Sequence, residues 1–559
     1  MTQQWWKQAV VYQIYPKSFM DSDGDGYGDI NGIISKLDYL SDLGVDVLWL
    51  TPIYPSPEKD NGYDISDYYA INPRYGTLEQ FKQLLEQVHQ RGMKLIMDIV
   101  VNHTSTEHEW FKQAMSSVDN PYHDFYIWRD GSPETPPNNW LSKFGGSAWQ
   151  YCAGVGKYYL HLFDVTQADL NWENPRVRQE IYRMMRYWLE LGVDGFRLDV
   201  INLISKQQSF ADDTLLTPTA DGRKFYTDGP RIHEYLHEMN HEVFALRDGL
   251  LTVGEMSSTT LESCILYTNP TRKELDMVFN FHHLKVDYVG GEKWSLGRFD
   301  FIQLKQLFNT WQSGMQAGGG WNALFWSNHD QPRALSRFGD QINYPYESGS
   351  MLATAIQLMQ GTPYIYQGEE IGMTNPGFTH LEQYRDVEAL NAARLLAERG
   401  HSEAEILAIL QAKSRDNART PMQWDDSLHA GFTSGTPWIE VAANYPQLNA
   451  QRVIIQDDSI YHYYRKLSQL RKSSAAIIAG EYQIYFADDP QLYVYTRSLA
   501  NEVILVVNNF YGENCNFILP EALHAYSNVE YLLNNYLEQP DNWRQFTLRP
   551  YQSVVLLLQ

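Results

Sequence analysis

The sequence predicts an α/β protein built on a TIM (β/α)8 barrel, with a small domain inserted after the third strand and a C-terminal antiparallel β-sandwich. Eight apolar strand-like runs alternate with amphipathic helical runs, which is typical of βαβ units. The alternation stops once, in a stretch with clusters of Pro, Gly, Asn and Trp, and from about residue 480 it gives way to short hairpin-like runs. We therefore expect the barrel at 1–103 and 171–479, the inserted domain at 104–170 and the sandwich at 480–559.

The eight barrel strands are expected in chain order. They lie at 10–16, 45–52, 93–102, 193–201, 250–255, 275–281, 323–330 and 363–369. The helices expected at 32–44, 78–92 and 177–192 each end at a glycine, the residue most common just past a helix C-terminus. A long insertion at 371–440 follows the eighth strand, and a helix at 459–474 is expected to close the barrel.

Four segments beyond the barrel are predicted to be strands of the sandwich, because short apolar runs alternate there with turn residues. They are QLYVYTRS (491–498), EVILVVNN (502–509), NCNFILP (514–520) and YQSVVLLLQ (551–559).

Composition limits the partners that the protein can have. The net charge is −24 over 559 residues, so the surface repels phosphate backbones and a nucleic acid is not expected to bind. No apolar run is long enough to span a membrane, and the N-terminus lacks a signal-peptide pattern. Three scattered cysteines favour a reducing compartment. We expect a cytoplasmic protein that is a monomer or a weak oligomer.

Charged residues stand at the ends of expected barrel strands, where a TIM barrel carries its chemistry. Arg197 and Asp199 are two apart on one strand, so both point into the barrel mouth, and the guanidinium would keep the Asp199 carboxylate ionised. An ionised, fixed carboxylate is what a nucleophile needs. Glu255 ends the apolar run LLTVGE, where poor hydration favours the protonated form that a general acid requires.

A third acid, Asp330, follows His329 in FWSNHDQPR, and His103 ends another strand. These side chains are predicted to bind sugar hydroxyls at the same mouth. Two carboxyl groups in different protonation states are the machinery of glycoside hydrolysis, and direct attack by one of them would retain the anomeric configuration.

Five segments carry a resemblance to a known family. They are DIVVNH (98–103), QADLN (167–171), GFRLDV (195–200), TVGE (252–255) and FWSNHD (325–330). Over nearly its full length the sequence resembles the α-amylase family, glycoside hydrolase family thirteen. The resemblance implies Asp199 as nucleophile, Glu255 as acid/base and Asp330 as transition-state stabiliser.

The same resemblance implies a closed pocket that takes the non-reducing glucose, so that single glucose units are released from a chain end. Arg415 would pair with Asp60 at the closed end, and Arg419 is the alternative. The residues implied to contact substrate are Asp60, Tyr63, His103, Phe163, Gln167, Arg197, His329 and Arg415.

Within the family the sequence resembles the oligo-1,6-glucosidase branch, with Val200 after the nucleophile, and resembles the trehalose-6-phosphate hydrolases more. VGEMSSTT (253–260), FNFHHLKVDY (279–288) and SKFGGSAW (142–149) carry that likeness. It implies hydrolysis of α,α-trehalose 6-phosphate to glucose and glucose 6-phosphate. On a chain of charge −24 a sugar phosphate needs a local cationic patch, which we expect from Lys285 with Lys293 and His282 or His283.

Other functions stay open at this point. An oligo-1,6-glucosidase is the main alternative, although QADLN departs from the QPDLN usual there. A non-catalytic amylase-like interaction protein is a distant one, because such proteins lack these acids and carry a membrane anchor. Hydrolysis and transglycosylation share one glucosyl-enzyme, so the sequence does not separate them.

The segment DSDGDGYGD (21–29) is predicted to bind a metal ion away from the catalytic acids. Its alternating aspartates resemble half of a calcium loop. The family pattern implies Asp21, Asp23, Asp25 and Asp29 as ligands, with the backbone carbonyl of Tyr27. We expect structural Ca²⁺, with Mg²⁺ as the alternative and an acidic turn without metal as the third reading.

Overall fold

The computed structural model describes residues 4–215 and 220–559; residues 1–3 and 216–219 of the expected barrel lie outside the described residues. Eight parallel strands form one sheet in the order β11-β10-β9-β3-β2-β1-β13-β12. They are β1 (Val11–Ile14), β2 (Val47–Leu50), β3 (Lys94–Val100), β9 (Gly195–Asp199), β10 (Leu251–Glu255), β11 (Met277–Phe279), β12 (Ala323–Leu324) and β13 (Thr362–Tyr366). A parallel bridge between Val278 and Asn322 brings the two edges together, so the predicted barrel is confirmed.

The strands are apolar because helices cover the outside of the barrel and side chains fill its inside. The covering helices are amphipathic: α3 (Leu78–Gln90) begins with a capping box of Thr77 and Gln80, and α5 (Pro175–Glu190) buries seven side chains along one face. The single helix expected at 32–44 is wrong. The chain forms α1 (Ile30–Ser35) and α2 (Leu37–Leu43) instead, because Lys36 leaves the helical region at φ −111° and ψ 7°.

The seventh strand is much shorter than the predicted 323–330. It pairs with β13 only at Ala323 and Leu324, and the chain then leaves the sheet. His329 and Asp330 therefore lie on the loop that follows β12, at the carboxyl end of the barrel, and not on the strand itself.

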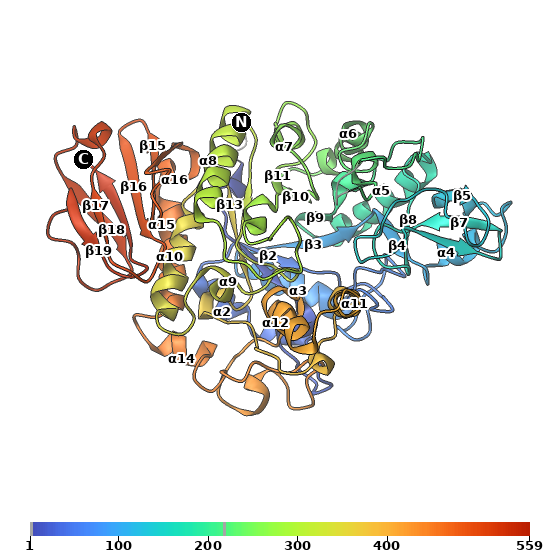
Figure 1. Cartoon of the computed structure of the whole chain (residues 1–559), viewed down its shortest axis with the longest axis horizontal. Coiled ribbons are helices and arrows are strands. Elements are labelled where there is room, and N and C mark those ends of the chain that lie inside the picture. The colour runs from blue at the N-terminus through green and yellow to red at the C-terminus, as the bar shows by residue number, and fades with distance from the viewer. Residues whose placement is uncertain (1–3, 216–219) are drawn as a thin grey trace.

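The stretch between β3 and α5 forms a separate layer at one side of the barrel (Figure 1). In it β4 (His103–Ser105) pairs with β8 (Gln167–Asp169), and β7 (Lys157–Leu160) lies between β5 (Trp128–Asp130) and β6 (Trp149–Cys152). An ammonium group joins this layer to the barrel, because Lys206 Nζ lies 3.0 Å from both Asp169 Oδ2 and Asn102 Oδ1.

The C-terminal strands lie on the opposite side of the barrel (Figure 1). A five-stranded antiparallel sheet packs against a two-stranded one, as the sequence predicted. The strands are β14 (Glu481–Tyr485), β15 (Leu492–Leu499), β16 (Glu502–Asn509), β20 (Ser553–Leu558) and β18 (Val529–Asn534) in the first sheet, and β17 (Cys515–Ile518) and β19 (Gln545–Leu548) in the second. Helix α15 (Ile460–Ser473) ends the barrel before them.

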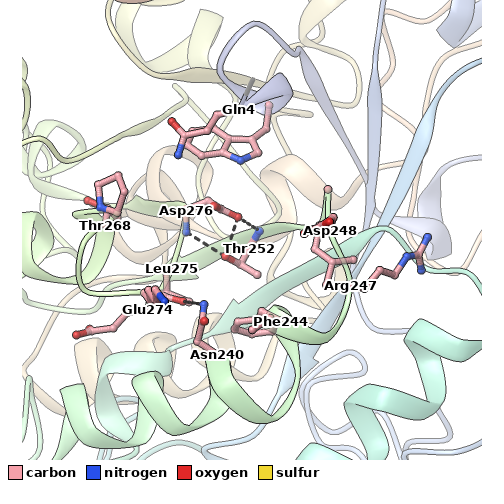
Figure 2. A pocket seen from close by; sticks show the side chains of 16 residues that line it. Gln4, Asn240, Phe244, Arg247, Asp248, Thr252, Thr268, Glu274, Leu275 and Asp276 are labelled. Atoms are coloured by element: carbon pink, nitrogen blue, oxygen red, sulfur yellow. Dashed lines mark hydrogen bonds between the residues drawn. The ribbon is translucent and has the colours of Figure 1, made fainter. Parts of the chain in front are cut away.

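Two cavities lie at opposite ends of the barrel. One, of about 270 Å³, is at the amino ends of β10 and β11. There Asp276 accepts hydrogen bonds from the N–H and Oγ1 of Thr252 (Figure 2). The other lies at the carboxyl ends of the strands and holds the predicted catalytic acids. Within residues 4–215 and 220–559, every helix is too short or too polar to span a lipid bilayer.

Candidate active site

The cavity at the carboxyl ends of the strands has a volume of about 240 Å³ and a strongly charged lining. Its wall is built from the loops that follow the barrel strands and from the inserted layer. The charged residues of the lining are Asp60, Lys143, Asp199, Glu255, Lys285, Lys293, Asp330, Glu388 and Arg415. Aromatic rings of Tyr63, Phe144, Phe163, Phe281 and Tyr288 supply apolar faces of the kind that sugars stack on.

One guanidinium holds the two principal carboxyls together. Arg197 Nη1 lies 2.5 Å from Asp199 Oδ1, and its Nη2 lies 2.8 Å from Glu255 Oε2. Nη1 also binds Asp98 Oδ1 at 2.9 Å. Both carboxyls lie against the terminal nitrogens of one rigid group, which holds them side by side at the cavity. Arg197 itself is 1% exposed and is not part of the cavity wall.

The two carboxyls differ in their affinity for a proton. Burial raises the pKa of Asp199 to about 6, against the opposing effect of Arg197. Burial raises the pKa of Glu255 further, to about 8, and the negative charge of Asp199 adds to the effect. Near neutral pH Asp199 is therefore largely ionised and Glu255 largely protonated, which is the division of labour that a nucleophile and a general acid require.

Asp330 stays ionised for a different reason. Burial alone would raise its pKa, but His329, Arg415 and Arg419 together lower that pKa below its usual range. Arg419 Nη2 lies 2.7 Å from Asp330 Oδ1 and Arg415 Nη1 lies 3.3 Å from it. A fixed negative charge here is placed to stabilise positive charge that develops in the cavity.

Arg415 closes one end of the cavity. Its Nη2 lies 2.9 Å from Asp60 Oδ1 and 2.5 Å from Asp386 Oδ1. Asp386 is fully buried and caps α11 (Val387–Glu398), so the guanidinium is anchored behind the wall. The pairing with Asp60 was predicted for Arg415, with Arg419 as the alternative, and the structure shows the Arg415 pair.

Two further predicted contact residues lie behind the lining, as Arg197 does. Gln167 Nε2 donates to Asp60 Oδ2 at 3.1 Å, and His329 stacks on the Tyr63 ring with centroids 5.1 Å apart. Neither side chain is in the cavity wall. They orient residues of the lining, Asp60 and Tyr63. His103, by contrast, lines the cavity, and burial lowers its pKa to about 4, so its imidazole is neutral.

The expected phosphate patch needs correction. Burial lowers the pKa of both His282 and His283 to about 4, so neither is a cation near neutral pH. His283 Nε2 donates to the carbonyl of Phe325 at 2.8 Å, and the His282 ring packs on Trp311. Neither ring is in the lining. The sequence placed them next to Lys285, but the short helix η7 (His282–Lys285) turns them away from the cavity, and only its last two residues, Leu284 and Lys285, line it.

Two lysines face the cavity with no carboxylate in salt-bridge distance among the described residues. Lys285 comes from the loop after β11, and Lys143 comes from the inserted layer. The Lys143 Nζ lies 3.2 Å from Ser257 Oγ, and burial, followed by the charges of Arg223 and Lys285, lowers the pKa of Lys143 to about 8. Lys293 also lines the cavity, but its Nζ lies 2.6 Å from Glu388 Oε2.

Sequence reasoning missed Lys143, Glu388 and Asp98 as site residues. Lys143 lies in SKFGGSAW, a segment quoted for its likeness to relatives, yet a lysine in a glycine-rich loop carries no local signal of function. Glu388 is recognisable only from the cation that it meets in the fold, Lys293, whereas Asp98 opens the motif DIVVNH but shows its role only through its contact with Arg197.

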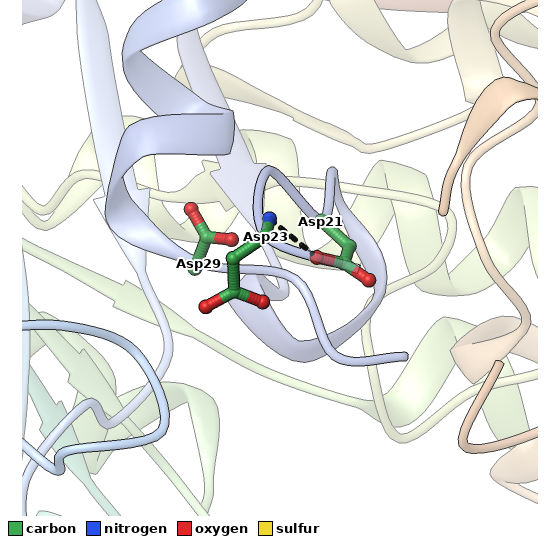
Figure 3. A group of neighbouring side chains, drawn as sticks. All are labelled: Asp21, Asp23 and Asp29. Carbon is green, nitrogen blue, oxygen red and sulfur yellow. Dashed lines mark hydrogen bonds between the residues drawn. The ribbon is translucent and has the colours of Figure 1, made fainter. Parts of the chain in front are cut away.

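The aspartate-rich loop lies apart from this cavity. Asp21, Asp23 and Asp29 bring oxygens within 4.8 Å of one another (Figure 3). Three converging carboxylates fit a hard divalent cation. Asp25 is not in that cluster; its Oδ1 accepts the Tyr27 N–H at 2.8 Å. Gly26 has φ +94°, and a Cβ there would lie 2.0 Å from the Thr436 carbonyl oxygen. Only glycine therefore allows the loop to pack this close to the backbone of Thr436.

Comparison with known proteins agrees with this geometry. The model of the α-amylase catalytic domain matches residues 13–480. The chain belongs to the α-amylase family. A model of the α-amylase SusG C-terminal domain matches residues 492–555, so the terminal sandwich of this α-amylase-family chain also has counterparts.

Individual relatives in the α-amylase family match the whole chain. A trehalose-6-phosphate hydrolase of Bacillus subtilis is 59% identical over 99% of this chain and 98% of its own length. An oligo-1,6-glucosidase of Parageobacillus thermoglucosidasius is 52% identical, with 99% of each chain covered. The crystal structure of a Bacillus licheniformis trehalose-6-phosphate hydrolase has a TM-score of 0.95 at 59% identity, again with 99% of each chain covered.

Proposed function

We propose that this protein hydrolyses α,α-trehalose 6-phosphate to glucose and glucose 6-phosphate with retention of configuration. The observation that carries the proposal is a cavity that combines a nucleophile and acid pair with two lysines free of acidic partners, Lys143 and Lys285. A relative at 59% identity over nearly the full length is a trehalose-6-phosphate hydrolase, and the oligo-1,6-glucosidase above is more distant in identity.

The unphosphorylated glucose is proposed to occupy the closed end, against Asp60 and Arg415. Glu255 donates its proton to the bridging oxygen while the Asp199 carboxylate attacks the anomeric carbon from the opposite face. Asp330 stabilises the positive charge of the transition state. Glu255, now ionised, then takes a proton from water, which attacks the same carbon and releases glucose from Asp199.

The phosphorylated glucose leaves on the lysine side of the cavity. Phosphate carries between one and two negative charges near neutral pH, and an ammonium that has no carboxylate partner has its full charge available to it. Lys293 contributes less, because Glu388 already neutralises it. Burial lowers the pKa of Lys143, and an anion bound beside it would raise that pKa again and favour the charged ammonium.

We propose Ca²⁺ as a structural ion in the aspartate-rich loop, held by Asp21, Asp23 and Asp29. The loop is tied to the segment around Thr433, whose Oγ1 donates to Asp21 Oδ2, so an ion there would fasten two distant parts of the chain. We further propose that the protein works in the cytoplasm as a monomer or weak oligomer. A charged sugar phosphate does not cross a bilayer unaided, and all three cysteines are unpaired.

A product assay tests the main proposal. Purified protein is given α,α-trehalose 6-phosphate, isomaltose and 4-nitrophenyl α-glucoside, and the anomer released first is read by NMR. We expect the highest kcat/KM on the phosphorylated disaccharide and α-glucose as the first product. A higher kcat/KM on isomaltose would identify an oligo-1,6-glucosidase, and β-glucose as first product would exclude the double-displacement mechanism.

A further inference from the structure

Val200, the residue after the nucleophile, has an unusual backbone. Its φ is 35° and its ψ is 40°, in the left-handed region. Twelve non-glycine residues in the described part of the chain have positive φ, and Val200 is the only β-branched residue among them. A β-branched side chain is strained in this conformation, which persists only where the surrounding structure holds it.

The surroundings hold Val200 from three directions. Its carbonyl accepts the Leu203 N–H at 2.9 Å, and its side chain is 8% exposed within a cluster that includes Trp140 and Leu203. The following loop is clamped to the loop after β10, because Asn202 Oδ1 accepts the Ser257 N–H and Asn202 Nδ2 donates to the Ser257 carbonyl, both at 2.9 Å. Val200 therefore cannot relax towards an extended conformation without breaking these contacts.

The left-handed turn places the Val200 N–H on the acid/base. The nitrogen lies 3.0 Å from Glu255 Oε2, and Arg197 Nη2 lies 2.8 Å from the same oxygen. An oxygen that accepts one N–H bond and lies against a guanidinium is the less favourable of the two oxygens for a proton. The other oxygen, Oε1, accepts no hydrogen bond from any described residue.

We propose that the left-handed turn at Val200 positions the acid/base: its N–H and Arg197 together reserve Glu255 Oε2 as an acceptor, so that Oε1 carries the catalytic proton. In the first step the Oε1 proton passes to the glycosidic oxygen, which keeps the electrons of the broken C1–O bond, while an Asp199 oxygen bonds to C1. The Val200 N–H touches no reacting atom, so Val200 is a positioning residue. The inference rests on Glu255 as acid/base but not on which glucoside is the substrate.

Replacement of one amide by an ester tests the hydrogen bond directly. Cell-free nonsense suppression can introduce 2-hydroxy-3-methylbutanoic acid at position 200, which replaces the N–H by oxygen and keeps the side chain. Because an N–H donor favours the ionised carboxylate, its loss raises the pKa of Glu255. We expect the alkaline limb of kcat/KM against pH to move up by about one unit.

The same variant should also distinguish leaving groups. With the proton no longer fixed on Oε1, kcat/KM for a disaccharide should fall roughly tenfold, while kcat/KM for 4-nitrophenyl α-glucoside changes little because nitrophenolate needs less acid assistance. The matched control is an ester at Ile201, whose N–H has no acceptor among the described residues. If the two ester variants share one alkaline limb and one leaving-group ratio, the proposal is wrong. The assay uses whichever disaccharide the wild type cleaves, so this result is independent of substrate identity.

A pair of ordinary substitutions tests the backbone itself. Glycine normally lowers the melting temperature relative to alanine, because it loses more freedom on folding, but a left-handed position reverses the order. We expect Val200→Gly to melt at a higher temperature than Val200→Ala. A higher melting temperature for Val200→Ala would show that position 200 is not left-handed in the enzyme, and the inference would fail with it.

Discussion

The Lys293 ammonium lies 2.6 Å from Glu388 Oε2. One cation expected to bind the substrate phosphate is therefore already neutralised by an acid that the sequence did not point to. Glu388 Oε2 also lies 3.4 Å from Arg415 Nε, so this carboxylate lies between the cations of Arg415 and Lys293. Lys143 and Lys285, unlike Lys293, have no carboxylate within salt-bridge distance among the described residues. The experiments on phosphate recognition therefore compare these two lysines with Lys293.

Removal of either unpaired lysine should lower the kcat/KM for the phosphorylated substrate selectively. We expect Lys143→Ala and Lys285→Ala each to lower kcat/KM for trehalose 6-phosphate by about 10- to 100-fold, the usual effect of one charge-assisted hydrogen bond, with little change for 4-nitrophenyl α-glucoside. Lys293→Ala is the matched control, because it should affect both substrates alike. Equal losses on both substrates in the Lys143 and Lys285 variants would count against a phosphate contact.

The pH dependence of kcat/KM should be bell-shaped. Activity should rise with pH through the pKa of Asp199, about 6, because the nucleophile must be ionised. It should fall through the pKa of Glu255, about 8, because the acid must keep its proton. An unphosphorylated glucoside with an alcohol leaving group avoids the titration of phosphate itself and still needs the proton of Glu255. In Glu255→Gln the alkaline limb should disappear; a limb that survived there would belong to another group.

Arg415 should matter for stability as well as for binding. Its removal leaves Asp60 and Asp386 buried with less compensating charge, so we expect Arg415→Ala to lower the free energy of unfolding by about 3–5 kcal/mol. Arg415→Lys keeps the charge but loses the fork that reaches both acids, so it should unfold less readily than Arg415→Ala yet still show a raised KM. Calorimetry and steady-state kinetics on both variants check this, and an unchanged KM in both would show that the closed end does not bind sugar.

Chelation tests the proposed ion in the aspartate-rich loop. Treatment with EGTA should lower the melting temperature by a few degrees, and added Ca²⁺ should restore it more effectively than Mg²⁺. Asp23→Asn should need more Ca²⁺ for the same protection, whereas the catalytic rate at low temperature should stay nearly constant because the loop is remote from the cavity. If neither EGTA nor Ca²⁺ changes the melting temperature, the loop is an acidic turn that binds no metal.

Much of the architecture follows from local pattern. The apolar strands, the amphipathic helices between them and the polar residues at strand ends predict a barrel with Asp199 and Glu255 at its mouth, and the structure has both in one cavity. The predicted length of β12 was too great, because a run of apolar residues does not reveal how many of them pair with a neighbouring strand. The break at Lys36 likewise has no clear signal in an amphipathic run.

The residue types at the site can be read from the chain alone, since a charged side chain at the end of an apolar strand already implies a polar cleft. Which of those charges remain available depends on the folded arrangement. His282 and His283 turn inward and lose their charge on burial, Lys293 meets Glu388, and Lys143 arrives from a distant loop. Ionisation and pairing depend on burial and on neighbours that are far away in the chain, and local spacing carries no information about either.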